Sequence, residues 1–198
     1  MPTWLALVGA YLIGSLDFAV VVARAHGVDI HSVGSGNPGT SNVLRTLGRG
    51  PAVMVFLGDA LKGVIATAIG WLAVGAGDPG NQPIALAAGF LAVAGHCFPV
   101  FHRFKGGKGV ATGAGVLVFA LPVAAAVLAT TWVVIAKVFK VASIASLTTV
   151  AAAIPLAIWQ GTRGAALAWL IAIVVLIVFR HANNIKRMIG GSEERVPT

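Results

Sequence analysis

A glycine-rich segment near the start of the chain could bind an anion: Gly34-Ser35-Gly36-Asn37-Pro38-Gly39-Thr40-Ser41-Asn42, followed closely by Arg45. Glycine backbone amides can approach an anion closely, and Gly34 and Gly36 supply two of them. The side chains that could add hydrogen bonds or charge are Ser35, Asn37, Asn42 and Arg45. The pattern therefore suggests an anion site, although a plain interhelical turn with a helix N-cap at Ser41 or Asn42 would also explain it.

A second basic segment, residues 95–112, contains His96 and then alternates glycine with lysine: Lys105-Gly106-Gly107-Lys108-Gly109. It opens an apolar run, so helix N-terminal amides and two ammonium groups would face the same ligand. It is not a Walker A sequence, since position 102 is His and position 109 is Gly. A positive membrane anchor would need the lysines but not the glycines between them, so we favour a phosphate site here.

The third segment lies near the end of the chain and reads Arg180-His181-Ala182-Asn183-Asn184-Ile185-Lys186-Arg187. His181 and Asn184 are three residues apart and could share one face of a helix directed at the site. Lys186 and Arg187 are more simply explained as a basic cap on the preceding apolar run.

Charged residues also occur inside apolar runs, where they are costly. Asp59 and Lys62 lie three residues apart, on one helical face of the run 51–76. An ion pair within a membrane span usually marks function or a required pairing. Asp17 interrupts the first apolar run in the same way, although near the aqueous boundary it could be solvated.

Several kinds of reaction centre are missing from the sequence. Carboxylates are never clustered as a magnesium site requires, and the Cys and His spacing predicts no zinc site. There is no Gly-x-Ser-x-Gly nucleophile elbow and no His-x4-Asp acyltransferase signature. We therefore expect no metal and no cofactor, and a reaction that relies on anion binding, positioning and an already activated substrate.

The composition shows which elements must position these residues. Of 198 residues, 58% are hydrophobic and only 10% are charged, whereas about a quarter of an average soluble domain is charged. Lipid must therefore be the main solvent, which excludes a disordered chain, a disulfide scaffold and an ordinary cytosolic enzyme. The net charge of +8 is then explained by the positive-inside rule, and no nucleic-acid partner is expected.

Long apolar runs cover about 4–23, 51–76, 83–101, 110–136, 142–159 and 165–179. Counting 110–136 as one span puts Lys137, Lys140 and the basic C-terminal region outside, against the positive-inside rule. If that run instead breaks near Pro122 into two short helices, twelve of the 14 basic residues face the cytoplasm. We therefore predict an all-α bundle of about seven helices, some short or re-entrant, with the N-terminus out and the C-terminus in. Residues 1–198 are expected to form one domain.

The three polar segments together resemble the cytoplasmic motifs of the PlsY family, the bacterial acyl-phosphate:glycerol-3-phosphate acyltransferases. The resemblance covers nearly the whole chain in order, and includes Asp59-x-x-Lys62-Gly63 and Ala142-Ser143-Ile144-Ala145-Ser146. It implies seven helices and transfer of a fatty acyl group from acyl phosphate to the 1-hydroxyl of glycerol 3-phosphate. The products would be lysophosphatidic acid and phosphate, formed without acyl-CoA, in the cell (inner or plasma) membrane and at its cytoplasmic face.

The resemblance also implies roles for individual residues. The set expected to be catalytic or essential is Ser35, Arg45, His181, Asn184 and Glu193. The set expected to bind substrate, from the patterns and the resemblance together, is Gly34, Gly36, Asn37, Asn42, Asp59, Lys62, His96, Lys105, Gly106, Gly107, Lys108 and Ser143. Two positions depart from the family: Thr40-Ser41 stands where Ala-Thr is common, and Asn183 where an acidic residue is common.

Two questions stay open from the sequence. The base that takes the proton of the attacking hydroxyl is either the substrate's own phosphate, as is proposed for the family, or His181 or His96. An anion transporter is the alternative function, because glycine-rich re-entrant segments also build transport sites. The absence of internal symmetry argues against it, and we expect a monomer that meets only membrane lipid and its two phosphate-bearing substrates.

Overall fold

The computed structural model describes residues 1–75 and 77–195, and these form helices and loops with no strand. The α-helices are α1 (Thr3–Gly14), α2 (Phe18–Ala25), α3 (Thr40–Leu47), α4 (Arg49–Val74), α5 (Pro83–Cys97), α6 (Val110–Ala120), α7 (Pro122–Phe139), α8 (Ala142–Trp159), α9 (Gly164–Arg180) and α10 (Ala182–Ile189). Two short 3-10 helices, η1 (Pro79–Asn81) and η2 (Val100–His102), complete the described part of the chain.

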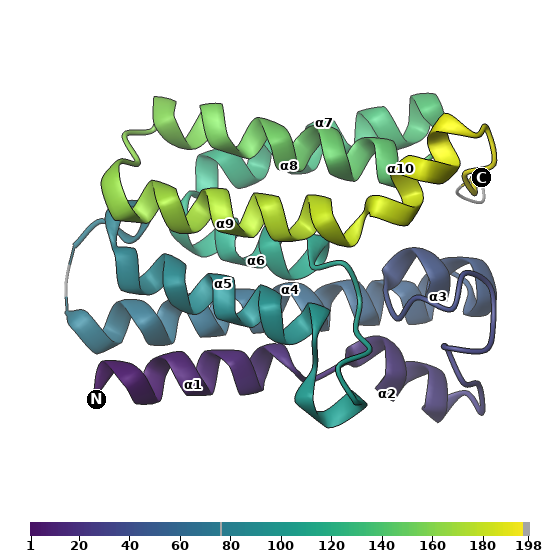
Figure 1. The fold of residues 1–198 in the computed structure, drawn as a ribbon, viewed down its shortest axis with the longest axis horizontal. Helices are drawn as coiled ribbons and strands as arrows, with labels where there is room; N and C mark the ends of the chain where they lie inside the picture. Colours follow the sequence, from purple (N-terminus) through teal and green to yellow (C-terminus); the bar gives the residue numbers. More distant parts are fainter. Residues whose placement is uncertain (76, 196–198) are drawn as a thin grey trace.

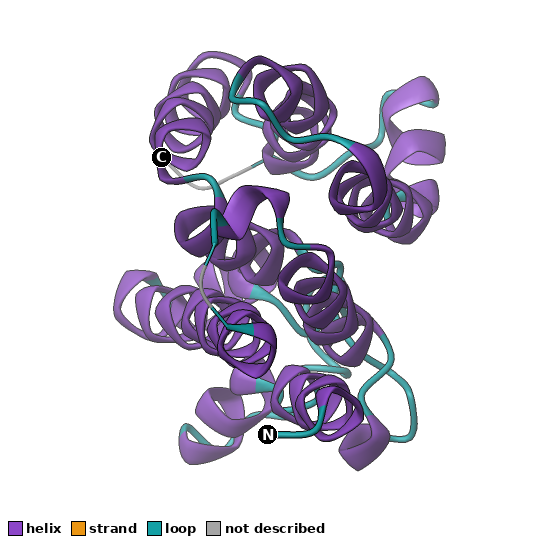
Figure 2. Ribbon diagram, turned by 90° about the vertical axis from the view of Figure 1, so that its left-hand side faces the viewer, coloured by secondary structure: helices purple, strands orange, loops and turns teal. Residues whose placement is uncertain are grey.

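The longer helices run side by side along one axis, so the connecting loops gather at the two ends of the bundle (Figure 1). The N-terminus lies at one end, and the C-terminal tail at the other, beyond α10. Seen along the helices, the described residues form a bundle of helices without a sheet (Figure 2). The three polar segments of the sequence lie toward the end that carries the C-terminal tail.

Five helical segments are long and apolar enough to cross a membrane: Thr3–Ala25, Arg49–Val74, Pro83–His102, Pro122–Phe139 and Ala142–Trp159. A sixth candidate joins α9 and α10, which are bent by 53° relative to each other. The fold is therefore an all-α membrane bundle, as expected. Helices α2, α3 and α10, with eight residues each, add to the seven helices that the sequence predicted.

Two of the boundaries expected from the sequence need correction. The run 4–23 is not one helix, because the chain breaks at Ser15–Asp17 and the Asp17 carboxylate caps α2 by accepting the Val20 amide at 3.1 Å. Asp17 is buried rather than solvated. Helix α3 also begins earlier than the turn suggested, at Thr40, with Gly39 rather than Ser41 or Asn42 at the N-cap position. The expected break near Pro122 is confirmed, with Pro122 as the first residue of α7.

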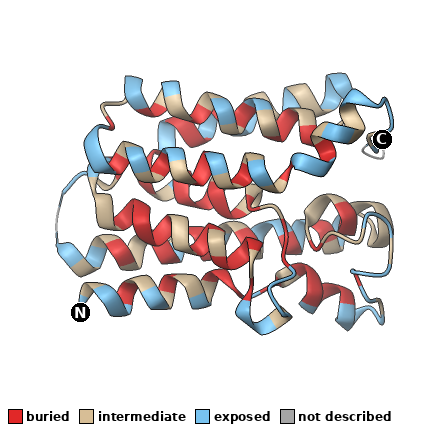
Figure 3. Cartoon of the chain, viewed as in Figure 1, coloured by how far each residue is buried: buried red, intermediate tan, exposed pale blue. Residues whose placement is uncertain are grey.

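Small residues let the helices of the bundle approach closely. A Cβ on Gly63 of α4 would overlap the Thr112 carbonyl of α6, and a Cβ on Gly115 of α6 would overlap the Ala60 carbonyl of α4. Such contacts between backbones are typical of helices that associate in lipid, where burying apolar surface against another helix gives little advantage. The main core lies between α5, α6, α7, α8 and α9, while large apolar side chains remain exposed on the outward faces (Figure 3).

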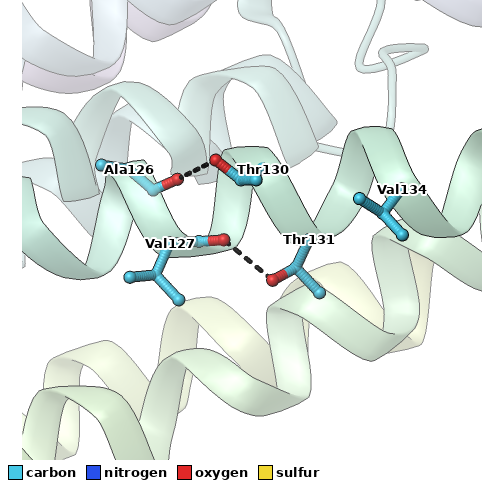
Figure 4. Close-up of a pocket in the computed structure, with 5 residues that line it drawn as sticks. All are labelled: Ala126, Val127, Thr130, Thr131 and Val134. Carbon is cyan, nitrogen blue, oxygen red and sulfur yellow. Dashed lines mark hydrogen bonds between the residues drawn. The ribbon is translucent and has the colours of Figure 1, made fainter.

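An apolar recess of about 500 Å³ lies on the side of α7, lined by Ala126, Val127, Thr130, Thr131 and Val134 (Figure 4). Its two threonine hydroxyls donate to the backbone carbonyls of Ala126 and Val127 at 3.0 and 2.8 Å. The hydroxyl hydrogens are thereby used within the helix, and the lining of the recess is mainly apolar. It contains none of the polar residues that the sequence singled out.

Candidate active site

The first polar loop is held in shape by one buried side chain, Asn42. Its carboxamide nitrogen donates to the carbonyls of Ile30 and Val33, and its oxygen accepts the Ser35 amide at 3.0 Å. A Cβ at Gly34 would overlap that oxygen, and Gly34 has a positive φ of 55°. Asn42 therefore folds the loop, which leaves the side chain of Ser35 exposed on its surface.

Arg45 connects the first loop to the C-terminal tail. It sits in the last turn of α3, and its guanidinium pairs with the Glu194 carboxylate at 2.8 Å. The Nε atom of Arg45 is buried without a hydrogen-bond partner among the described residues. A guanidinium can donate to several acceptors at once, so Arg45 keeps capacity for a further anionic ligand.

Glu193 is the centre of a polar cluster at the same end of the bundle. Its carboxylate accepts hydrogen bonds from the Ser143 hydroxyl at 2.7 Å, from Arg187 Nε at 2.8 Å and from the Asn184 carboxamide. Burial alone would raise the pKa of the Glu193 carboxyl group, but these three hydrogen bonds outweigh it and the pKa is lowered. The cluster ties the start of α8 to α10 and to the tail through an ionised glutamate.

The second polar loop is fixed where it passes the other two. The Gly107 amide donates to the His96 carbonyl at 3.1 Å, and a Cβ on Gly107 would overlap the His96 ring and the Pro38 carbonyl of the first loop. Arg180, at the end of α9, donates to the carbonyls of both Gly106 and Gly107 at 2.7 and 3.0 Å. All three segments therefore meet at Gly106–Gly107.

Lys108 follows this crossing and stands among the charged groups of the tail. Burial lowers the pKa of its ammonium to about 8, against the opposing effect of the nearby Glu193 carboxylate. Arg187 and Arg45 lower it further, and Glu194 raises it. Helix α6 begins two residues later, so its first amides face the same region as the ammonium.

His181 lies at the bend between α9 and α10 and is buried. Its Nδ1 is 2.7 Å from the Ile177 carbonyl, which can only accept, so Nδ1 carries the hydrogen. In the neutral ring, Nε2 is then free to accept a hydrogen bond. Asn184 stands three residues further along and is also buried, with its carboxamide oxygen unpartnered among the described residues.

Asp59, Lys62 and His96 form a second, fully buried cluster below the loops. The Lys62 ammonium contacts the Asp59 carboxylate at 2.7 Å, the Leu16 carbonyl at 2.8 Å and His96 Nδ1 at 2.8 Å. An ammonium can only donate, so Nδ1 of His96 accepts here. His96 Nδ1 also lies 3.5 Å from the Asp59 carboxylate, a longer contact than the one with Lys62. The charged groups of the cluster thus pair with one another, and the His96 carbonyl connects the cluster to the second loop at Gly107.

The structure thus brings together Arg45, Lys108, Ser143, His181, Asn184 and Glu193 from widely separated parts of the chain. Lys105 stays exposed on the surface of its loop, and Asn37 and Gly36 are half-buried in theirs. Asn183, where the family pattern differs, is exposed on α10.

The sequence did not single out three residues that the structure places in the site region: Arg180, Arg187 and Glu194. Arg187 had looked like a basic cap on the last apolar run and Arg180 had been given no role, and only their contacts reveal a use for them. Glu194 follows Glu193 in a tail without periodicity, so no pattern pointed to it. The resulting site has cationic groups, bare amides and a few neutral polar groups, which suits two anionic substrates held side by side.

Known proteins resemble this chain in sequence. Residues 4–191 match the family model described as glycerol-3-phosphate acyltransferase. The chain is 44% identical over 199 residues to the glycerol-3-phosphate acyltransferase of Burkholderia pseudomallei (strain K96243), covering 99% of this chain and 96% of that protein. It is 44% identical over 204 residues to that of Cupriavidus pinatubonensis, covering 99% and 97%.

Two solved structures have the same fold. The crystal structure of PlsY, an integral membrane glycerol 3-phosphate acyltransferase, in its glycerol 3-phosphate form, superimposes with a TM-score of 0.93 at 37% identity. The lysophosphatidic acid form superimposes with a TM-score of 0.90, and each comparison covers 99% of this chain and 96% of that one. The chain therefore belongs to the PlsY family of integral, multi-pass membrane glycerol-3-phosphate acyltransferases.

Proposed function

We propose that this protein transfers a fatty acyl group from acyl phosphate to the 1-hydroxyl of glycerol 3-phosphate, giving lysophosphatidic acid and phosphate. The observation that carries the proposal is the meeting of Arg45, Lys108 and Arg187 at one end of an apolar bundle, beside the start of α6. Both substrates carry a phosphate, and one also carries an acyl chain. Cations at the end of a lipid-facing bundle fit that combination.

The reaction needs no covalent enzyme intermediate. An acyl phosphate is a mixed anhydride, so the substrate hydroxyl oxygen can attack its carbonyl carbon directly. The bond from that carbon to the bridging phosphate oxygen then breaks, phosphate leaves with the electron pair, and the hydroxyl proton passes to a base. What the protein must provide is neutralisation of charge and alignment of the two substrates.

The site residues can be grouped by the part of the substrates that each group would bind. We assign the phosphate of glycerol 3-phosphate to Lys105, Lys108 and the amides beyond Gly106–Gly107. Arg45 and Ser35 are assigned to anion binding from the first loop, beside the Gly34–Gly36 backbone. His181, Asn184, Glu193 and Ser143 line the opposite wall, where Glu193 fixes the orientation of the other polar groups. Asp59, Lys62 and His96 act on the substrates only through the loop that they support.

Two groups remain as candidates for the base that takes the proton of the attacking hydroxyl. His96 accepts from Lys62 at Nδ1, so in the neutral ring its Nε2 carries the hydrogen and has no lone pair for a substrate proton. His181 has the opposite tautomer and a free Nε2. The rival is a phosphate oxygen of the substrate itself. Near-wild-type turnover of His181→Ala at saturating substrate would exclude the histidine.

We further propose that the polar end faces the cytoplasm, in the inner or plasma membrane, with the N-terminus out and the C-terminus in. This is supported by the positive-inside rule, because in this orientation twelve of the 14 basic residues face the cytoplasm. Arg163 lies at the other end and Lys62 within α4. We propose one domain that works as a monomer, with no nucleic-acid partner.

The deciding experiment uses the purified protein in detergent or bilayers with palmitoyl phosphate and glycerol 3-phosphate. Phosphate release and lysophosphatidic acid are measured together, and equal amounts of both are expected. The rate should be lost in Lys108→Ala and absent when palmitoyl-CoA replaces palmitoyl phosphate. Ala165→Ser, an exposed change at the opposite end of the bundle, is the control and should keep full activity.

Other outcomes would contradict the proposal. Phosphate release without lipid product would indicate a hydrolase or a different acceptor. Full activity with palmitoyl-CoA would show that the donor is wrong. Uptake of glycerol 3-phosphate into vesicles by a folded but catalytically silent protein would indicate a transporter.

A further inference from the structure

The Gly106–Gly107 segment is held from two sides, which fixes the direction of its peptide groups. On one side the Gly107 amide donates to the His96 carbonyl. On the other, Arg180 Nη2 donates to the Gly106 carbonyl at 2.7 Å and Arg180 Nε to the Gly107 carbonyl at 3.0 Å. One guanidinium therefore holds two consecutive carbonyl groups through its rigid, planar fork of donors.

The guanidinium is itself held in place. It lies over the ring of Phe98, with its carbon 5.1 Å from the ring centroid, where the π face attracts a cation. Arg180 is the last residue of α9, directly before buried His181, so its backbone is anchored at the bend into α10. A basic residue that only anchors a span would extend into water or to lipid headgroups, whereas this side chain is directed at the second loop.

The consequence for the site follows from the planarity of the peptide bond. In a trans peptide the N–H points opposite to the C=O of the same group, and the described residues contain no cis peptide. Because the Gly107 carbonyl points at Arg180, the Lys108 amide points away from it. That amide has no backbone acceptor outside the helices among the described residues, and it stands directly before α6. Arg180 thus turns one donor outward and withdraws two carbonyl dipoles that would repel a phosphate.

We infer that Arg180 is a positioning residue of the acyltransferase: through the Gly106 and Gly107 carbonyls it orients the Lys108 amide and side chain that bind the phosphate of glycerol 3-phosphate. The inference rests on the proposed function of the second loop. It concerns affinity for one substrate, since Arg180 touches the loop and not the reacting atoms.

The test compares Arg180→Lys with the wild type in steady-state kinetics, varying each substrate in turn. An ammonium has donors for both carbonyls but lacks the rigid planar fork that fixes them in one geometry, so the loop should lose its fixed orientation. We expect KM for glycerol 3-phosphate to rise by about tenfold, while KM for palmitoyl phosphate and kcat change less than about threefold. Phe98→Leu, which removes the ring beneath the guanidinium, should raise the same KM by about threefold.

Arg163→Lys is the matched control. Arg163 also donates to two carbonyls, those of Ile158 and Thr162, but at the opposite end of the bundle. If replacing such an arginine only weakens the fold, both variants should lower the thermal unfolding temperature and the active fraction and leave both KM values unchanged.

The outcomes separate this inference from the proposed function. A wild-type protein that forms no lysophosphatidic acid would overturn the function itself. An active wild type together with a folded Arg180→Lys variant of unchanged KM for glycerol 3-phosphate would overturn the inference alone. If Arg180→Lys does not fold, Phe98→Leu decides: an unchanged KM in that variant overturns the inference, and a selective rise supports it.

Discussion

Lys108 makes the site sensitive to pH, because its ammonium has a pKa of about 8. The group is charged below that pH and loses its charge as the pH rises through it, whereas the substrate phosphate is already fully ionised above a pKa of about 6. We therefore expect kcat/KM for glycerol 3-phosphate to fall above about pH 8. A bound phosphate stabilises the ammonium, so kcat should fall only at higher pH. Initial rates across pH 6 to 10 show where kcat/KM and kcat each begin to fall.

Two variants assign that limb to Lys108. Lys108→Arg keeps the charge at high pH and should move the alkaline limb upward, though a guanidinium fits the space less well and lowers the maximum rate. Lys140→Arg changes an exposed lysine in the connection between α7 and α8 and should leave the profile as it is. An alkaline limb that stays in place in Lys108→Arg would mean that another group titrates.

Glu194 pairs with Arg45, the residue that we propose binds an anionic substrate. Its carboxylate is 2.8 Å from the guanidinium and 41% exposed, so the pair can open into water. A phosphate that binds Arg45 beside this carboxylate would meet its negative charge and share the guanidinium with it. We expect Glu194→Gln to lower KM for one of the two substrates by about two- to threefold, most clearly at low ionic strength, since exposed ion pairs contribute little and are screened by salt.

The kinetic comparison for Glu194 has a control of equal charge. Asp29→Asn removes one exposed carboxylate from the first polar loop without touching Arg45, and the amide oxygen can still accept the His31 amide. Its KM values should match the wild type. The substrate whose KM falls in Glu194→Gln is the one that Arg45 binds. If neither KM changes, the Glu194 carboxylate does not oppose substrate binding at Arg45.

At the scale of the elements, α4 and α5 are joined by the buried cluster of Asp59, Lys62 and His96. Asp59 and Lys62 are 1% and 2% exposed, so removing one charge leaves the other unpaired in a nonpolar environment. We expect Asp59→Asn to destabilise the fold by about 3–5 kcal/mol, whereas Asp59→Asn combined with Lys62→Met should recover part of that loss. Thermal unfolding in detergent measures all three proteins.

This prediction also separates support from binding. The His96 carbonyl holds the Gly107 amide, and Lys62 holds the His96 ring. The double variant should therefore recover more of its thermal stability than of its affinity for glycerol 3-phosphate. Equal thermal stability of Asp59→Asn and the wild type would contradict the buried pairing. Full recovery of KM in the double variant would show that the cluster does not position the loop.

At the scale of the whole molecule, the orientation in the membrane can be tested with single cysteines. Cys97 is buried and should not react, and a Cys97→Ala background removes it. Ser192→Cys lies exposed in the C-terminal tail and Ala165→Cys exposed at the opposite end. In right-side-out membrane vesicles, an impermeant maleimide should label Ala165→Cys and reach Ser192→Cys only after lysis. The reverse pattern would invert the proposed topology.

The sequence by itself determined the class of molecule and most of its helices. Charged residues at 10% of the chain exclude a soluble fold, and proline and basic residues bound the apolar runs. The run 142–159 became α8 with the same limits, and the run 165–179 became α9 within one residue. The short helices α2 and α3 were not predicted, because they are set by tertiary contacts and by the Asp17 cap rather than by a long apolar run.

Only the tertiary structure decided how the polar residues divide between holding the loops and facing a substrate. Arg180 lies 73 residues from Gly107, and Ser143 lies 50 residues from Glu193. No local pattern can specify such pairs, because they depend on which helices pack together and in which register. The same holds for Asn42 and Lys62, whose residue types suggested binding. Once packed, their donors and acceptors are used by the protein itself.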